Sequence, residues 1–128
     1  MKGKTDHADR GATCLVVDDE PAMLRLISIL LEDMGCQTML APNAEAALEI
    51  LGETAPDLMI ADVRLPGVDG VELTRAVKAN ENFSSMPVLL MSAYGEPRGH
   101  SGDDFLAKPF DIDTLTDFVA PYIEQQTS

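Results

Sequence analysis

The sequence predicts an α/β domain: a doubly wound, five-stranded parallel sheet with helices on both faces. Five short apolar runs, each bounded by turn residues, recur along the 128 residues, and stretches with helical spacing lie between them. Strands that are buried on both faces read as continuous apolar runs. Alternation of strand and helix favours parallel strands with right-handed crossovers. A chain of this length forms one domain and can bury a core without disulfides or metals.

The five predicted strands are the apolar runs themselves. Their letters are CLVV, TMLA, LMIA, VLLM and FLA, at 14–17, 38–41, 58–61, 88–91 and 105–107.

Four helices are predicted between and after these strands. The first has apolar residues three and four apart, with Pro21 in its opening turn and Gly35 just past its end. Asn43 can cap the second helix. Pro121 lies inside the last helix, where we expect a kink or an early end because proline cannot donate a backbone hydrogen bond. The predicted helices cover 21–34, 43–51, 71–79 and the stretch from Asp111 to 123.

Composition limits the compartment and the partners. Residues 13–123 are predicted to form the domain, with flexible tails at 1–12 and 124–128. Neither a membrane-spanning run nor a signal peptide is present, so we expect a cytoplasmic protein. The net charge of −13 argues against binding to nucleic acid or to anionic membranes. Cys14 and Cys36 are predicted to be reduced, buried and without a zinc site.

Polar side chains follow four of the five predicted strands. Asp18 and Asp19 follow the first strand, Asp62 the third, Ser92 the fourth and Lys108 the fifth. A single strand that ends in Asp is commonplace, but ligands of doubly wound sheets bind outside the carboxyl ends of the strands. Together these residues predict a functional site at one edge of the sheet.

Three carboxylates and one ammonium predict a site for a hard divalent cation. Mg²⁺ prefers oxygen ligands and is commonly held by one or two carboxylates together with phosphate oxygens. Such an ion would relieve the repulsion between neighbouring acids and let a phosphoryl group approach them. Asp62 is then a candidate nucleophile that forms an aspartyl phosphate. Lys108 and the Ser92 hydroxyl could stabilise the phosphoryl oxygens.

Four stretches resemble the receiver domain of bacterial two-component response regulators. They are LVVDDEP at 15–21, DLMIADVRLPGVDGVEL at 57–73, MSAY at 91–94 and DDFLAKPF at 103–110. The resemblance covers about 13–123. It implies the strand order 2-1-3-4-5 and, because little follows the last helix, a receiver of the stand-alone type.

The resemblance also implies how phosphorylation proceeds. Asp62 would accept a phosphoryl group from a histidine of a sensor kinase or phosphotransfer domain. Asp19, Asp62 and the backbone carbonyl of Arg64 would bind Mg²⁺, with Asp18 assisting through water. Lys108 would pair with the phosphoryl oxygens, across a cis bond to Pro109.

The resemblance implies a switch as well. Ser92 would contact the phosphoryl group and form the switch pair with Phe105. New negative charge on Asp62 offers strong acceptor oxygens. We expect Ser92 to move toward them and Phe105 to fill the space that it leaves. The surface over the last two strands and the last helix would then change.

The segment 93–104 departs from the family pattern. Lys108 follows Ser92 by 16 positions, roughly six fewer than is usual. AYGEPRGHSGDD holds three glycines and one proline in twelve residues. We therefore predict a shortened or missing fourth helix, replaced by a mobile loop. His100 in this loop is expected in solvent, and Tyr94 either gates access beside Ser92 or covers the loop.

Three other classes remain open from the residues alone. A phosphatase with a nucleophilic aspartate would carry a second acid where Arg64 stands. A flavin-binding carrier would need Ser, Thr and Gly where DDEP follows the first strand. A scaffold that is never phosphorylated would not need the complete set of acidic, hydroxyl and lysine positions, which this sequence has. We expect a protein that catalyses only its own phosphorylation and dephosphorylation, and that either binds an unidentified target protein or relays phosphate to another histidine.

Overall fold

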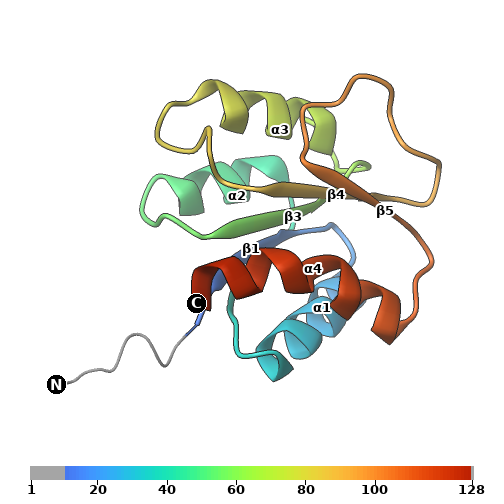
Figure 1. Ribbon diagram of the computed structural model, residues 1–128. Helices are drawn as coiled ribbons and strands as arrows, with labels where there is room; N and C mark the ends of the chain where they lie inside the picture. Colours follow the sequence, from blue (N-terminus) through green and yellow to red (C-terminus); the bar gives the residue numbers. More distant parts are fainter. Residues whose placement is uncertain (1–10, 128) are drawn as a thin grey trace, which may run out of the picture.

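The computed structural model describes residues 11–127, which form one parallel sheet covered by helices on both faces (Figure 1). The strands are β1 (Thr13–Val17), β2 (Gln37–Ala41), β3 (Leu58–Asp62), β4 (Val88–Ser92) and β5 (Asp104–Ala107). The helices are α1 (Pro21–Asp33), α2 (Ala44–Leu51), α3 (Gly70–Ala79) and α4 (Ile112–Thr127). Each predicted strand and helix is present, with bounds that shift by a few residues.

The strand order is β2-β1-β3-β4-β5, and all pairs are parallel, as predicted. The register brings the carboxyl ends of the strands level with one another. Val17 at the end of β1 pairs with Ala41 on β2 and with Ala61 on β3. Toward the β5 edge of the sheet, Asp62 on β3 pairs with Met91 on β4, and Ser92 on β4 pairs with Ala107 on β5. This alignment collects the residues that follow the strands at one edge.

Two hydrophobic layers hold the helices on the sheet. Helices α1 and α4 cover one face, and α2 and α3 cover the other (Figure 1). Along β1, Cys14 and Val16 join the first layer, while Leu15 and Val17 join the second. Such alternation is required of a strand that is buried on both sides. It explains why the strands read as unbroken apolar runs.

The two cysteines are free thiols inside this core, as predicted. Burial, together with the nearby charge of Asp57, raises the pKa of Cys36 to about 11. Burial also raises the pKa of Cys14 well above its ordinary value. Because the thiolate is the reactive form, both side chains behave as small apolar residues.

The predicted absence of a fourth crossover helix is confirmed. Residues 93–103 connect β4 to β5 through bends and turns only. The expectation that His100 lies in solvent is wrong, because its side chain is 9% exposed. The imidazole accepts a hydrogen bond from the Gly102 N–H at Nδ1 (3.0 Å), and Nε2 lies 2.8 Å from the Glu96 carboxylate. Polar contacts inside the segment therefore replace helical hydrogen bonds.

The structure describes part of each expected tail. Ala12 is buried, and its carbonyl accepts a bond from the Gln37 N–H, so the core begins inside the predicted tail. The rest of that predicted tail, 1–10, lies outside the described residues. Of the two expectations for Pro121, the early end is wrong, because α4 continues to Thr127 through most of the predicted tail 124–128; the kink stays a prediction. Val119 and Ile123 on either side of the exposed proline are buried, and their packing holds the helix together.

Candidate functional site

The carboxyl edge of the sheet gathers the predicted polar residues. Asp18 directly follows β1, Asp62 and Ser92 end β3 and β4, and Lys108 directly follows β5. Backbone bonds extend the parallel ladder to these positions. The Asp18 N–H donates to Ala41 O (3.1 Å), and the Lys108 N–H donates to Ser92 O (2.9 Å). The sheet therefore fixes the backbone position of each of these residues.

Lys108 joins two of the three acids. Its Nζ lies 2.9 Å from Oδ2 of Asp18 and 3.0 Å from Oδ2 of Asp62. The side chains of Lys108, Asp18 and Asp62 are 10%, 0% and 9% exposed. Little water reaches this pair of contacts, which makes them stronger than surface ion pairs. Asp19, by contrast, is exposed.

The ammonium of Lys108 remains charged in this site. Burial lowers the pKa of Lys108, but its hydrogen bonds to Asp18 and Asp62 and their negative charge outweigh burial, so the pKa is raised above its ordinary value. Three carboxylates around one ammonium still leave an excess of negative charge. Such an edge attracts a cation and repels a free anion.

The acids fit a divalent cation. Asp18, Asp19 and Asp62 each offer a carboxylate oxygen, and these oxygens lie within 4.8 Å of one another. Short turns orient two of the carboxylates, because Asp18 Oδ1 accepts from the Glu20 N–H (2.9 Å) and Asp62 Oδ1 from the Arg64 N–H (3.2 Å). A set of carboxylate oxygens with room for water is the donor set that Mg²⁺ prefers. The residues present therefore fit the predicted ion.

Ser92 and Phe105 lie on neighbouring strands and on the same side of the sheet. Phe105 pairs with Leu90, two residues before Ser92, and it packs against the α2–α3 layer. The Ser92 side chain is buried, and its Oγ accepts a bond from the Tyr94 N–H at 2.9 Å. Phe105 is partly buried. The two residues are thus neighbours, as the predicted switch pair requires.

The sequence did not predict a contact between Arg64 and Tyr94. The guanidinium carbon of Arg64 lies 4.5 Å from the centroid of the Tyr94 ring. Each of these residues comes two positions after a site residue, Asp62 or Ser92. Tyr94 is 75% exposed, so this cation–π contact lies at the mouth of the site. This position agrees with the expectation that Tyr94 lies beside Ser92 at the entrance to the site.

Gly70 is a second residue whose importance the sequence did not predict. It begins α3 directly against the end of β3, and its N–H donates to Val63 O (2.9 Å). A Cβ at this position would overlap the backbone carbonyl of Asp62 and would lie 2.9 Å from Val63 Cα. The close approach of the two backbones therefore requires a glycine at this position.

An α/β sheet that gathers acids, a hydroxyl and a lysine at its carboxyl edge fits a domain that accepts a phosphoryl group. The sequence matches the response regulator receiver domain family over residues 14–120, and the chain belongs to that family. It is therefore a receiver domain of two-component systems. Membership excludes the flavin carrier and the phosphatase as descriptions of this chain.

Relatives and solved structures agree with this assignment. Sporulation initiation phosphotransferase F of Bacillus subtilis is 35% identical over 116 residues, 85% of this chain and 91% of that protein. The phosphate regulon transcriptional regulatory protein PhoB of Pseudomonas aeruginosa is 34% identical over 106 residues, 78% of this chain but 46% of PhoB. A receiver domain of a sensor histidine kinase from Pseudomonas aeruginosa, solved with a magnesium ion in its active-site cleft, superposes with a TM-score of 0.80 at 28% identity. That match covers 89% of this chain and 98% of the other.

Within residues 11–127, no helix is both long enough and apolar enough to cross a membrane.

Proposed function

We propose that Asp62 accepts a phosphoryl group from a phosphohistidine and that the aspartyl phosphate switches protein–protein binding. The observation that carries this proposal is the position of Lys108 Nζ, 3.0 Å from Asp62 Oδ2, beside acids whose oxygens lie within 4.8 Å of one another. A site with this charge balance can hold a cation and a phosphoryl group side by side. We place the donor in a sensor kinase or a histidine phosphotransfer domain of the cytoplasm.

The chemistry requires an in-line transfer. An oxygen of Asp62 forms a bond to phosphorus while the bond from phosphorus to the histidine nitrogen breaks, and the electron pair remains on the departing imidazole. Lys108 would exchange its contact with Asp62 for one with a phosphoryl oxygen, and Ser92 would donate its hydroxyl to another. Asp18, Asp19, Asp62 and the Arg64 carbonyl would hold Mg²⁺, which supplies positive charge to the equatorial oxygens when bound.

Hydrolysis of the aspartyl phosphate would return the protein to its resting state. The chain would therefore act on no external substrate and would catalyse only its own phosphorylation and dephosphorylation. Signal output would then depend on which surface the switch pair, Ser92 and Phe105, changes. We propose a target protein as the receiver of that signal.

A second candidate function is a phosphorelay shuttle that returns the phosphoryl group to another histidine. One observation favours it: the chain matches 91% of the length of a relative named as a phosphotransferase. The test is transfer itself. After phosphorylation, the protein would be mixed with a histidine phosphotransfer domain, and loss of label from Asp62 with gain on histidine would support the shuttle.

The proposed function is tested by mass. The protein would be incubated with acetyl phosphate, with and without Mg²⁺, beside Asp62→Asn and the control Asp113→Asn, an exposed acid on α4. We expect a single phosphoryl adduct in the wild type and in Asp113→Asn that requires Mg²⁺, and none in Asp62→Asn. No adduct under conditions that label another receiver would overturn the proposal and favour a scaffold.

A further inference from the structure

The segment 93–103 is tied to the molecule at two different places. Its last residue is fixed to β4 and α3: the Asp103 carboxylate accepts the Val88 N–H (2.8 Å) and pairs with Lys78 Nζ (2.7 Å). Its first residues are fixed to the phosphorylation site through Tyr94. We call residues 93–99 the arm and residues 100–103 the anchor.

The anchor is packed against the sheet. A Cβ on Gly102 would lie 3.3 Å from the Leu90 side chain and 3.2 Å from His100 Nδ1, so the backbone of Gly102 covers Leu90 directly. His100 is 9% exposed and bonds to Gly102. These contacts hold the anchor without any contribution from the site.

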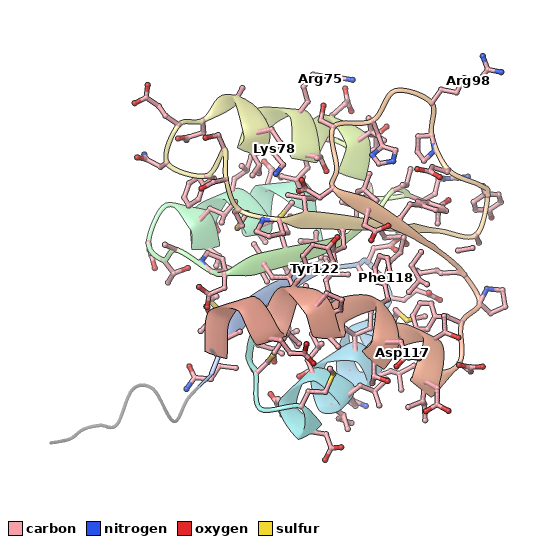
Figure 2. All side chains as sticks on the ribbon, in the orientation of Figure 1. Arg75, Lys78, Arg98, Asp117, Phe118 and Tyr122 are labelled. Carbon is pink, nitrogen blue, oxygen red and sulfur yellow. The ribbon has the colours of Figure 1, made fainter. Side chains whose placement is uncertain are left out.

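The arm, in contrast, has hinges and weak ties. Gly95 and Gly99 adopt φ values of +96° and +64°, so each side of the tip can rotate as other residues cannot. The carboxylate of Glu96 that meets His100 is 58% exposed, and exposed ion pairs stabilise little. Arg98 at the tip extends into solvent (Figure 2).

Within residues 11–127, the two remaining contacts of the arm both depend on the resting state of the site. The Tyr94 N–H donates to Ser92 Oγ (2.9 Å), the hydroxyl that phosphorylation is expected to draw away. The Tyr94 ring lies under the Arg64 guanidinium, two residues after the phosphoryl acceptor. A charge-assisted hydrogen bond to a phosphoryl oxygen is stronger than an exposed cation–π contact, so a new dianion on Asp62 competes for this guanidinium.

We propose that the contact between Arg64 and Tyr94 is a latch that holds the arm closed until Asp62 is phosphorylated. Phosphorylation removes the acceptor of the Tyr94 N–H and draws Arg64 off the ring, and the arm then opens about Gly95 and Gly99. The anchor keeps its place. This inference rests on the proposed function, because it takes Asp62 as the phosphoryl acceptor.

Trypsin cleavage after Arg98 measures the opening of the arm. At low protease the cleavage rate follows the open fraction, and intact mass identifies the fragments 1–98 and 99–128. Three proteins would be compared: the wild type, Tyr94→Leu, which removes the aromatic face, and Tyr94→Phe, which keeps it. Because Tyr94 is 75% exposed, neither substitution disturbs the core. Each protein would be tested with Mg²⁺ alone and with Mg²⁺ and beryllofluoride, a mimic of the phosphoryl group.

We expect resting Tyr94→Leu to be cleaved about two- to five-fold faster than the wild type, and Tyr94→Phe to match the wild type. Beryllofluoride should accelerate cleavage of the wild type and of Tyr94→Phe by at least that factor, and of Tyr94→Leu by less. Equal resting rates in Tyr94→Leu and the wild type would overturn the latch. So would an unchanged or slower rate in the wild type with beryllofluoride bound.

Fluorine NMR separates this failure from failure of the proposed function. A bound beryllofluoride signal that requires Mg²⁺ and disappears in Asp62→Asn shows that the acceptor site works. With that signal present, unchanged cleavage counts against the latch alone. Without it, the proposed function itself fails.

Discussion

Lys108 Nζ lies 3.0 Å from Oδ2 of Asp62, although 46 positions separate the two residues. Parallel β3 and β5 do not pair with each other, because β4 lies between them. The contact therefore spans two strand spacings and depends on the long lysine side chain. A second contact to Asp18, 2.9 Å away, fixes the ammonium between two strand ends. Lys108 is thus the residue that balances the acids in the resting protein.

Replacement of this lysine should destabilise the fold. Lys108→Met leaves Asp18 and Asp62 without a counter-ion, and loss of one partner of a buried pair is costly. We expect the free energy of unfolding to fall by up to about 3 kcal/mol. This is the lower end of the usual cost of removing one partner of a buried ion pair, because cations can still bind at this edge of the sheet. Urea denaturation in buffer with a metal chelator measures it.

Asp62→Asn is the matched comparison for Lys108→Met. It removes one of three clustered charges and keeps an oxygen that can accept from Lys108, so we expect a change below about 1 kcal/mol. Equal destabilisation by both substitutions would show that packing, and not charge balance, determines the stability of the site.

The same lysine predicts a pH dependence. Its pKa in the folded protein is raised above the ordinary value of 10.5, so the native state binds its proton more tightly than the unfolded chain. The stabilisation is fully present below that ordinary value and is lost as the pH rises through the raised one. The difference in unfolding free energy between the wild type and Lys108→Met should therefore stay constant from pH 7 to about 10 and then shrink. A difference that already declines between pH 7 and 9 would contradict this account.

Sheet and site could be predicted from the sequence because both follow from local patterns. Buried parallel strands read as apolar runs, and the residue after each run must lie at the carboxyl edge. The sequence therefore predicts that Asp18, Asp62, Ser92 and Lys108 lie together, and the structure places them there. The missing helix also followed from local composition, since glycine and proline disfavour it.

Features that depend on packing between loops could not be predicted in this way. The contact of Arg64 with Tyr94 joins two loops that no periodicity relates. The His100 side chain is 9% exposed and lies beside Gly102, which contacts Leu90, whereas a histidine in a polar loop ordinarily lies in solvent. The sequence predicts a kink or an early end at Pro121, but α4 does not end there, because buried residues on either side of the proline hold the helix together. In each case tertiary contacts override local preference.

Magnesium should stabilise the protein through the exposed acid as well as the buried ones. A ligand that binds only the native state adds RT ln(1 + [L]/Kd), about 1.4 kcal/mol at ten times Kd. Within residues 11–127 the exposed side chain of Asp19 makes no hydrogen bond, so Asp19→Asn leaves the fold intact while it removes the charge of one candidate ligand. We expect the Mg²⁺-dependent rise in thermal stability to be smaller in Asp19→Asn than in the wild type.

The control for this measurement is sodium chloride at the same ionic strength, because Mg²⁺ also screens an acidic protein. Asp113→Asn removes an equal charge away from the site. If Asp19→Asn and Asp113→Asn retain the same response to Mg²⁺, Asp19 is not a ligand.

Gly70 should be intolerant of even one added methyl group. The Cβ of Gly70→Ala would overlap the Asp62 carbonyl oxygen, and both neighbours are backbone atoms that cannot rotate away. Either α3 or the end of β3 must shift, at a cost of about 1–3 kcal/mol. Because Asp62 would move with its backbone, phosphorylation by acetyl phosphate should slow as well.

Gly52→Ala is the matched control. Gly52 has a φ of −69°, and its nearest neighbour would lie 3.4 Å from the new Cβ, so the free energy of unfolding should be unchanged or rise by about 0.4–1 kcal/mol. Urea denaturation and the labelling rate of both variants test this, and a Gly70→Ala protein that labels at the wild-type rate would show that the close backbone contact does not position Asp62.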